Sequence, residues 1–357
     1  MPNPVNQMET GAKEITYCDY VASLGKKEVL IYGAGGVGTI TADILRNSGC
    51  NLRAFIDDDP KKQGMVIDGT KVLSYRDACK NFESVILVCT PNFAGTYKKL
   101  KGCGCTVQRF PVMMSRRGFY SKDLLLKNEK KIKKVFNLLA DNLSKTIFQK
   151  ILKNRMMMDF SCLDECVCQN QYFPEDLFVL GSEECFVDGG ACRGETISAF
   201  LRETGGHFKF IYGFEPDKKS YAILLSNMLS VDPSRKELLN AALYDKTGQM
   251  EFSSKANGAS SISKSGSETI RLVALDEISM ENKPTYIKLD IEGAEVKAIR
   301  GMKRSVEACR PRLAVSVYHK PEDLWEIPLL LNRMFPFYRL FLRHYTDSLL
   351  ETVCYAI

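Results

Sequence analysis

The stretch FVDGGACRGET, residues 186–196, decides the fold, because an apolar strand there runs into a glycine-rich turn and then a helix-like segment. The next predicted strand, residues 210–214, is followed directly by an acid. In open α/β sheets, ligands bind beyond the carboxyl ends of the strands. Glycines permit close approach of the backbone, and an acid at the second strand end is placed to accept both hydroxyls of a ribose. We therefore predict a nucleoside site made by Asp188, Gly190, Ala191, Gly194 and Glu215.

The pattern of strands and helices after residue 171 indicates the fold class. Strands are predicted at residues 185–188, 210–214, 238–243, 250–253, 269–274, 285–290, 313–318, 338–343 and 351–357, and helices at 195–203, 218–229, 294–301 and 322–334. Strands that alternate with helices form a parallel sheet with crossover helices. The last two strands are joined by a short turn and must pair antiparallel. The predicted fold is α/β, the class I (Rossmann-like) methyltransferase architecture with a C-terminal antiparallel hairpin.

The turn after the first of these strands lacks the full G-x-G-x-x-G pattern of a dinucleotide site. No pyrophosphate therefore needs to be held there. A glycine loop followed by a ribose-binding acid fits an adenosine-type cofactor, which favours S-adenosylmethionine over NAD.

A second glycine motif lies near the N-terminus, in the segment EVLIYGAGGVG. A buried strand enters Gly33, Gly35 and Gly38 at G-x-G-x-x-G spacing, and Asp57 follows the next strand. This order of strand, glycine turn, helix and acid is typical of a nucleotide site, in which the helix N-terminus binds a phosphate and the acid accepts a ribose hydroxyl. We predict a smaller Rossmann-like domain within residues 1–115 with a nucleotide site. The alternative is a structural or regulatory module whose site is empty or accessory.

Residues 116–170 are predicted to be a helical linker to the second domain, residues 171–357. Between residues 121 and 155 there are ten lysines and arginines against three acids, while the whole chain carries a net charge of +6. The remainder is close to neutral, which disfavours a nucleic-acid-binding protein. The basic helix is interpreted as a connector; the alternative is a surface for a membrane or an anionic partner.

Length and composition lead to expectations about the number of domains, membrane spans, location and metal sites. A chain of 357 residues favours two domains, and no run of 18 apolar residues predicts a transmembrane helix. The polar N-terminus has no signal-peptide pattern, so a cytoplasmic protein is expected. Thirteen cysteines include close groups at Cys103 and Cys105 and at Cys162, Cys166 and Cys168. Neither group has zinc-site spacing, and no metal is expected.

Five segments of residues 172–357, in order VDGGACRGETI, FIYGFEPD, YIKLDIEGAE, LAVSVYHKPEDLWEIPLLL and LFLRHYT, resemble the FkbM-type S-adenosylmethionine-dependent methyltransferases. The resemblance implies the class I methyltransferase fold and O-methylation of a small-molecule or sugar hydroxyl. Cys192 stands where this family commonly has Asn. The first domain is similar, more weakly, to nucleotide- or coenzyme-A-binding-like Rossmann modules of polysaccharide biosynthesis proteins.

Methyl transfer to oxygen requires a group that removes the hydroxyl proton. Asp290, which also borders the predicted cofactor site, and His319 both follow strand ends and are the candidate bases. Six neighbouring side chains are candidates for acceptor binding: Lys288, Glu292, Lys320, Trp325, Arg343 and His344. Their alternatives are helix capping for Glu292, solvated surface positions for the lysines, and core packing for Trp325. Residues 257–263 are interpreted as a lid or a plain connection.

Two other functions stay open on the sequence alone. One is a non-catalytic nucleotide-binding scaffold in glycan assembly. The other is a nucleotide-dependent sugar-modifying enzyme centred on the N-terminal domain. The intact glycine loop and strand-end acid of the second domain favour the methyltransferase, because a scaffold needs neither.

Overall fold

The computed structural model describes residues 17–78, 84–90, 93–109, 122–157, 163–253, 261–262 and 268–357. The predicted lid, residues 257–263, lies largely outside these ranges, and so does Cys162. The chain divides into a first unit (residues 1–128, 149–167 and 346–350) and a second unit (129–148, 168–345 and 351–357). These units interleave in sequence, whereas the predicted domains are consecutive, and the predicted limits stay predictions.

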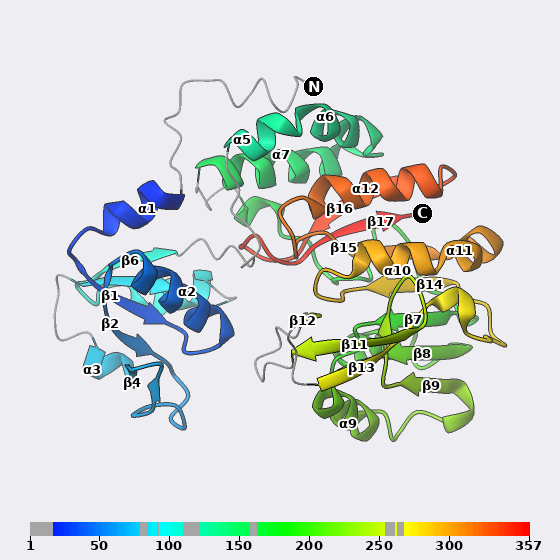
Figure 1. The fold of residues 1–357 in the computed structure, drawn as a ribbon, viewed down its shortest axis with the longest axis horizontal. Helices are drawn as coiled ribbons and strands as arrows, with labels where there is room; N and C mark the ends of the chain where they lie inside the picture. The colour runs from blue at the N-terminus through cyan, green and yellow to red at the C-terminus, as the bar shows by residue number, and fades with distance from the viewer. Residues whose placement is uncertain are drawn as a thin grey trace. The chain divides into compact units, whose positions relative to one another are not determined.

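The first unit contains a six-stranded sheet in the order β3-β4-β2-β1-β5-β6 (Figure 1). Its strands are β1 (Glu28–Tyr32), β2 (Asn51–Ile56), β3 (Val66–Ile67), β4 (Thr70–Leu73), β5 (Val85–Val88) and β6 (Thr106–Arg109). The helices of its N-terminal segment are α1 (Tyr17–Leu24), α2 (Gly36–Asn47), α3 (Tyr75–Ala78) and α4 (Phe93–Leu100). The pairs β1–β2, β1–β5 and β5–β6 are parallel, as the predicted Rossmann-like module requires.

The predicted helical segment 121–155 forms three helices: α5 (Lys122–Lys127), α6 (Glu129–Leu138) and α7 (Asn142–Met157). The break before α7 has a local cause. The carboxylate of Asp141 accepts a hydrogen bond from the backbone N–H of Ser144 at 2.6 Å. A side chain that satisfies a free N–H in this way starts a helix. Within the described part of the chain, every helix is too short or too polar to cross a bilayer.

The second unit is built on a seven-stranded sheet in the order β16-β17-β15-β14-β7-β8-β9 (Figure 1). Its strands are β7 (Cys185–Gly189), β8 (Phe210–Phe214), β9 (Lys236–Leu239), β14 (Tyr286–Leu289), β15 (Arg312–Ser316), β16 (Leu340–His344) and β17 (Thr352–Ala356). Strand β17 pairs antiparallel with both neighbours, which confirms the C-terminal hairpin. The principal helices are α8 (Glu195–Glu203), α9 (Lys218–Asn227), α10 (Glu295–Gly301), α11 (Lys303–Cys309) and α12 (Asp323–Met334).

A second, four-stranded sheet of this unit departs from the prediction. It has the order β10-β13-β11-β12, from β10 (Ala242–Leu243), β11 (Gly248–Ser253), β12 (Ser261–Ile262) and β13 (Glu268–Val273). The predicted strand 238–243 is therefore wrong, because its two halves join different sheets. Asn240 lies at the break, where its side-chain amide donates to the carbonyls of Glu215 and Pro216.

The core of the second unit explains why these segments form strands. All five residues of β7 are buried, and Phe186 stacks on Phe200 and Tyr286 with ring centroids 4.7 and 5.4 Å apart. Strands buried on both faces form nearly continuous apolar runs.

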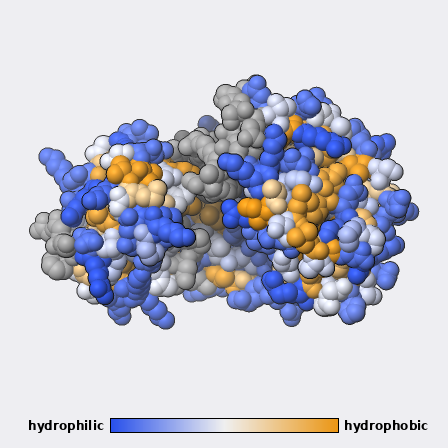
Figure 2. Space-filling model, turned by 90° about the horizontal axis from the view of Figure 1, so that it is seen from below, coloured by the Kyte–Doolittle hydropathy of each residue, from blue (hydrophilic) through white to orange (hydrophobic). Residues whose placement is uncertain are grey.

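On the face drawn in Figure 2, hydrophilic residues are interspersed with groups of hydrophobic ones.

Candidate functional site

The polar side chains of the candidate site gather where two parallel strands end. Asp290 follows β14 directly, and His319 lies three residues beyond β15. Because β14 and β15 are parallel neighbours, their carboxyl ends meet at the same edge of the sheet. Glu292 lies in the turn after β14, and Glu295 begins α10. The structure thus brings together both candidate bases and one of the predicted acceptor-binding residues.

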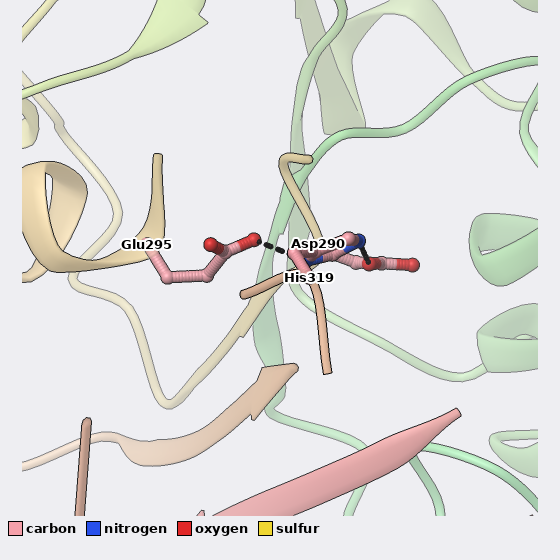
Figure 3. Close-up of side chains that lie close together, drawn as sticks. All are labelled: Asp290, Glu295 and His319. Carbon is pink, nitrogen blue, oxygen red and sulfur yellow. Dashed lines mark ion pairs between the residues drawn. The ribbon is translucent and has the colours of Figure 1, made fainter. Parts of the chain in front are cut away.

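His319 is surrounded by carboxylates (Figure 3). Its Nδ1 lies 3.0 Å from Oε1 of Glu295, and its Nε2 lies 3.3 Å from Oδ1 of Asp290 and 3.8 Å from Oε2 of Glu292. The side chain is only 3% exposed. Burial alone would lower the pKa of His319, but the three carboxylates, Glu295 above all, raise it to about 10. The imidazole therefore carries a proton at neutral pH in this arrangement.

Asp290 is held by two tyrosine hydroxyls. Tyr172 donates to Oδ2 at 2.8 Å, and Tyr318 donates to Oδ1 at 3.1 Å. Burial would raise the pKa of Asp290, but Lys288 and His319 lower it below its usual value. Asp290 is consequently ionised at neutral pH. Burial instead raises the pKa of neighbouring Glu292 to about 7.

The glycine turn after β7 is shaped by close contacts within the protein. Gly190 has a φ of +81°, and a Cβ there would lie 1.9 Å from the carbonyl oxygen of Asp290. At Gly194, with a φ of +94°, a Cβ would lie 2.8 Å from the Met228 side chain. The N–H groups of Gly190 and Ala191 both donate to the last carbonyl of β8. The sequence predicts that the backbone at these glycines approaches a ligand; in the structure the glycines also allow close contacts within the protein, and the ligand contact stays a prediction.

Glu215 stands directly after β8, beside that turn, and is 7% exposed. Its Oε2 accepts the N–H of Cys192 and its Oε1 accepts the N–H of Asp217, both at 2.8 Å. An ionised carboxylate offers about four lone-pair positions, so about two remain for hydroxyl donors. Burial raises the pKa of Glu215 to about 7, although the two backbone N–H groups oppose the rise. These features fit the ribose of an adenosine cofactor.

Asp188 and Lys288 form a buried ion pair beneath the turn. They are register partners on β7 and β14, with Nζ 2.9 Å from Oδ1 and side-chain exposures of 0% and 2%. Nζ also donates to the carbonyls of Gly189 and Gly190. Burial would lower the pKa of Lys288, but Asp188 raises it. Both side chains are sealed from solvent and hold the turn, and their predicted ligand contacts stay predictions.

Removing Lys288 should destabilise the protein strongly. We expect Lys288→Met to lower the free energy of unfolding by about 3–5 kcal/mol, because it leaves the Asp188 charge buried without a partner. Urea unfolding of the full chain measures the loss. Lys297→Met is the matched control, since Lys297 is 43% exposed and pairs with Asp245. Its change should be under about 1 kcal/mol. Similar losses in the two variants would contradict the prediction.

Lys320 and Trp325 are both engaged in contacts within the fold. Lys320 donates through Nζ to the carbonyl of Gly293, and its backbone N–H donates to Asp323 at 2.8 Å. Lys320 thus ties the turn after β14 to the segment before α12. Trp325 is fully buried in α12, which agrees with packing and leaves no ring face for a sugar.

Arg343 and His344 are also internal. Arg343 is 2% exposed and pairs with Asp141 at 2.7 Å and with Asp176 at 2.6 Å. His344 is fully buried, with Nδ1 2.8 Å from the hydroxyl of Thr352. Their predicted contact with an acceptor gains no support from this placement, because both side chains are engaged inside the fold.

The N-terminal glycine motif also forms a closed turn. A Cβ at Gly38 would lie 1.8 Å from the carbonyl of Gly33, so α2 packs directly on the turn, and Gly35 precedes that helix. The carboxylate of Asp57 accepts the N–H of Ala34 at 2.9 Å. Asp57 therefore lies beside the glycine turn, as predicted, and a nucleotide there stays a prediction.

Sequence reasoning missed four residues of the cluster. Tyr172 lies more than a hundred residues before Asp290, and no local pattern pairs them. Tyr318 and Glu351 share a hydrogen bond of 3.3 Å across two strands of the sheet. Glu295 had a local signal, because its carboxylate accepts the N–H groups of the preceding turn, as in a capping box.

Comparison with known proteins assigns both parts of the chain. Residues 188–349 match the family described as Methyltransferase FkbM domain, and residues 28–88 match the PglD N-terminal domain. A curated relative, Hexuronic acid methyltransferase AglP of Haloferax volcanii, is 28% identical over 104 residues. That match covers 28% of this chain and 43% of the relative, so the chain spans less than half of the relative's length.

A solved structure extends the likeness to nearly the whole chain. The crystal structure of Methyltransferase FkbM from Methylobacillus flagellatus is 21% identical, with a TM-score of 0.73 over 95% of this chain and 92% of that one. At that identity the likeness shows the fold. The predicted class I fold is thereby confirmed, and the family match of residues 188–349 confirms the predicted FkbM-type methyltransferase domain in the C-terminal half.

Proposed function

Because residues 188–349 form a domain of the FkbM methyltransferase family, we propose that this chain transfers the methyl group of S-adenosylmethionine to a sugar hydroxyl. One observation carries the proposal. The half-satisfied carboxylate of Glu215 and the ionised carboxylate of Asp290 follow β8 and β14, which flank β7 in one sheet. A ribose-binding acid and a proton acceptor therefore border the same strand-end edge.

The chain's own residues would divide the work between cofactor and acceptor. S-adenosylmethionine, when bound, supplies an electrophilic methyl group on a sulfonium. Glu215 would hold its ribose, and the turn at Gly190 would border it. The acceptor hydroxyl must lose its proton as its oxygen forms the new bond. Asp290, oriented by Tyr172 and kept ionised by His319, is the group we assign to this proton, with His319 as its partner.

The sugar acceptor is argued from chemistry and from one relative. The Haloferax volcanii protein is named for hexuronic acid methylation, and the N-terminal residues match a PglD domain. A sugar of a cell-surface glycan precursor is the acceptor class that we propose. The alternative of a non-catalytic scaffold gains no support here. Asp290 is ionised and its side chain is 24% exposed, which suits a proton acceptor and is not needed in a scaffold.

Binding and transfer are tested separately. Calorimetric titration of the full chain with S-adenosylhomocysteine measures the cofactor site. Incubation with S-adenosylmethionine labelled in its methyl group, together with a panel of uronic and neutral nucleotide sugars, measures transfer. Binding without transfer to any sugar would reject the acceptor class, and a folded chain that binds no S-adenosylhomocysteine would reject the proposal.

The pH dependence of cofactor affinity should follow Glu215. Its ionised form accepts the ribose hydroxyls, and burial sets its pKa to about 7. Affinity for S-adenosylhomocysteine is therefore present above pH 7 and should fall by about tenfold as the pH drops from 8 to 6. Calorimetry at pH 6, 7 and 8 measures this. Glu215→Gln should bind weakly at all three values, and a flat profile of the unchanged protein would contradict the assignment.

A further inference from the structure

Three carboxylates converge on the imidazole of His319, and two of them, Asp290 and Glu295, are drawn in Figure 3. Glu295 lies against Nδ1, whereas Asp290 and Glu292 lie against Nε2. Asp290, Glu295 and His319 each place a donor atom within 4.8 Å of the others. Oxygen and imidazole donors in such a group are those that bind divalent transition metals in proteins.

The two sides of the ring differ in exposure. The Glu295 side chain is 1% exposed, while those of Asp290 and Glu292 are 24% and 34% exposed. The Nδ1 side is therefore sealed, whereas the carboxylates on the Nε2 side are partly exposed, although Nε2 itself is buried. A metal site used in catalysis needs this combination, because one coordination position must stay open to the substrate.

Three buried polar atoms of this cluster lack a hydrogen bond of proper geometry. Among the described residues, neither ring nitrogen of His319 has a hydrogen-bond partner of proper geometry, and neither has Oε2 of Glu295. The ring nitrogens have only the ion pairs described above, whereas a buried oxygen without a partner, such as Oε2 of Glu295, costs about 1–3 kcal/mol. His319 is 7% exposed as a whole, so water does not relieve the cost.

The two distances from Nε2 suit one small ion on that side of the ring. Two donors that each lie about 2.1 Å from a tetrahedral ion are about 3.4 Å apart. The distances from Nε2 of His319 to the carboxylate oxygens of Asp290 and Glu292 are 3.3 and 3.8 Å. We propose that Nε2 of His319, which releases its proton to solvent on binding, and the carboxylates of Asp290 and Glu292 bind a divalent transition-metal ion, with Glu295 orienting the imidazole through Nδ1.

Surrounding contacts support this assignment. Metal-binding histidines usually present their second nitrogen to a carboxylate, and metal-binding carboxylates accept further hydrogen bonds. Glu295 takes the first role, and the hydroxyls of Tyr172 and Tyr318 take the second on Asp290. The nearby cation Lys288 is already paired with Asp188. A dication would therefore balance the three carboxylates.

The consequence for catalysis rests on the proposed methyl transfer. An ion at this position would bind the acceptor hydroxyl and lower its pKa, so that its proton passes more readily to Asp290. It would also anchor a second oxygen of the acceptor, such as a uronic carboxylate. The ion therefore belongs to acceptor activation, and cofactor binding at Glu215 does not depend on it.

Metal binding is tested without any turnover. The full chain is purified, treated with a chelator and titrated with Mn²⁺ alone. Bound Mn²⁺ is measured by the loss of the electron paramagnetic resonance signal of the free ion, and Zn²⁺ is then added as a competitor. We expect one site per chain. Glu295→Gln should weaken it by about 10–100-fold, as loss of an orienting carboxylate does, and His319→Gln should weaken it at least as much. Glu307→Gln, an exposed carboxylate paired with Lys303, should bind as the unchanged chain does.

The outcomes separate this inference from the proposed function. Circular dichroism first confirms that each variant is folded. A folded chain that binds neither ion, or a His319→Gln variant that binds as tightly as the unchanged chain, overturns the metal site. Binding of S-adenosylhomocysteine and methyl transfer in the presence of the chelator would overturn it too while leaving the proposed function intact. One tight Mn²⁺ site sensitive to His319 in a chain that transfers no methyl group would support the site and reject the function.

Discussion

Replacement of His319 by glutamine is expected to slow methyl transfer by about 10²–10⁴-fold while the affinity for S-adenosylhomocysteine stays unchanged. The imidazole lies 3.3 Å from Asp290 and lowers the pKa of that carboxylate. Without it, Asp290 loses one of the two cations, Lys288 and His319, that lower its pKa, and it loses the ion pair on Oδ1. The loss should therefore appear in the rate of transfer and leave the cofactor side untouched. Rapid-quench transfer assays and calorimetry on the same sample measure the two effects.

A matched control is available in the same unit. His207 is exposed, so His207→Gln changes the same residue type away from the cluster and should leave the rate unchanged. Since His319 is surrounded by carboxylates, its replacement also changes stability, and the melting temperature must be measured in parallel. A folded His319→Gln variant that transfers methyl groups at the unchanged rate would remove His319 from the mechanism.

Replacement of Glu215 by alanine is expected to weaken S-adenosylhomocysteine binding by about 10²–10⁴-fold. Two hydrogen bonds from ribose hydroxyls to a charged carboxylate contribute about 1.5–3 kcal/mol each. The same substitution removes the acceptor for the N–H groups of Cys192 and Asp217, which loosens the glycine turn. Both effects act in the same direction on cofactor affinity.

Glu237→Gln provides the comparison, because Glu237 is exposed on the neighbouring strand β9. It should bind S-adenosylhomocysteine with unchanged affinity. Thermal unfolding distinguishes a lost contact from a lost fold. If a folded Glu215→Ala variant kept its affinity, the ribose would have to lie elsewhere, and the assignment of this strand-end edge would fail.

Much of the fold follows from local patterns that the sequence shows plainly. The buried strand β7, the glycine turn after it and the acid that follows β8 are each local features of the chain. Periodicity and turn chemistry predict local features of this kind. The break between β9 and β10 depends instead on Asn240, whose amide bonds to the chain after β8. No window of neighbouring residues contains that contact.

The candidate site was predictable to a lesser extent. Asp290 and His319 follow strand ends, and parallel strands place such residues together. Lys288 is predicted either to bind an anionic acceptor or to be a solvated surface lysine, yet it occupies a fully buried strand. A charge inside such a strand requires a partner, and its register neighbour is Asp188. The tyrosine hydroxyls on Asp290 come from distant segments, so only the assembled sheet reveals them.

The contact between Gly190 and the carbonyl of Asp290 has a consequence for protein engineering. Because any side chain at position 190 would collide with the backbone that carries the acid, the cofactor turn and the proton acceptor cannot be altered independently. Libraries that aim at a new methyl acceptor should keep glycine at 190 and vary the rim around Glu292 instead, where exposure leaves room for new side chains.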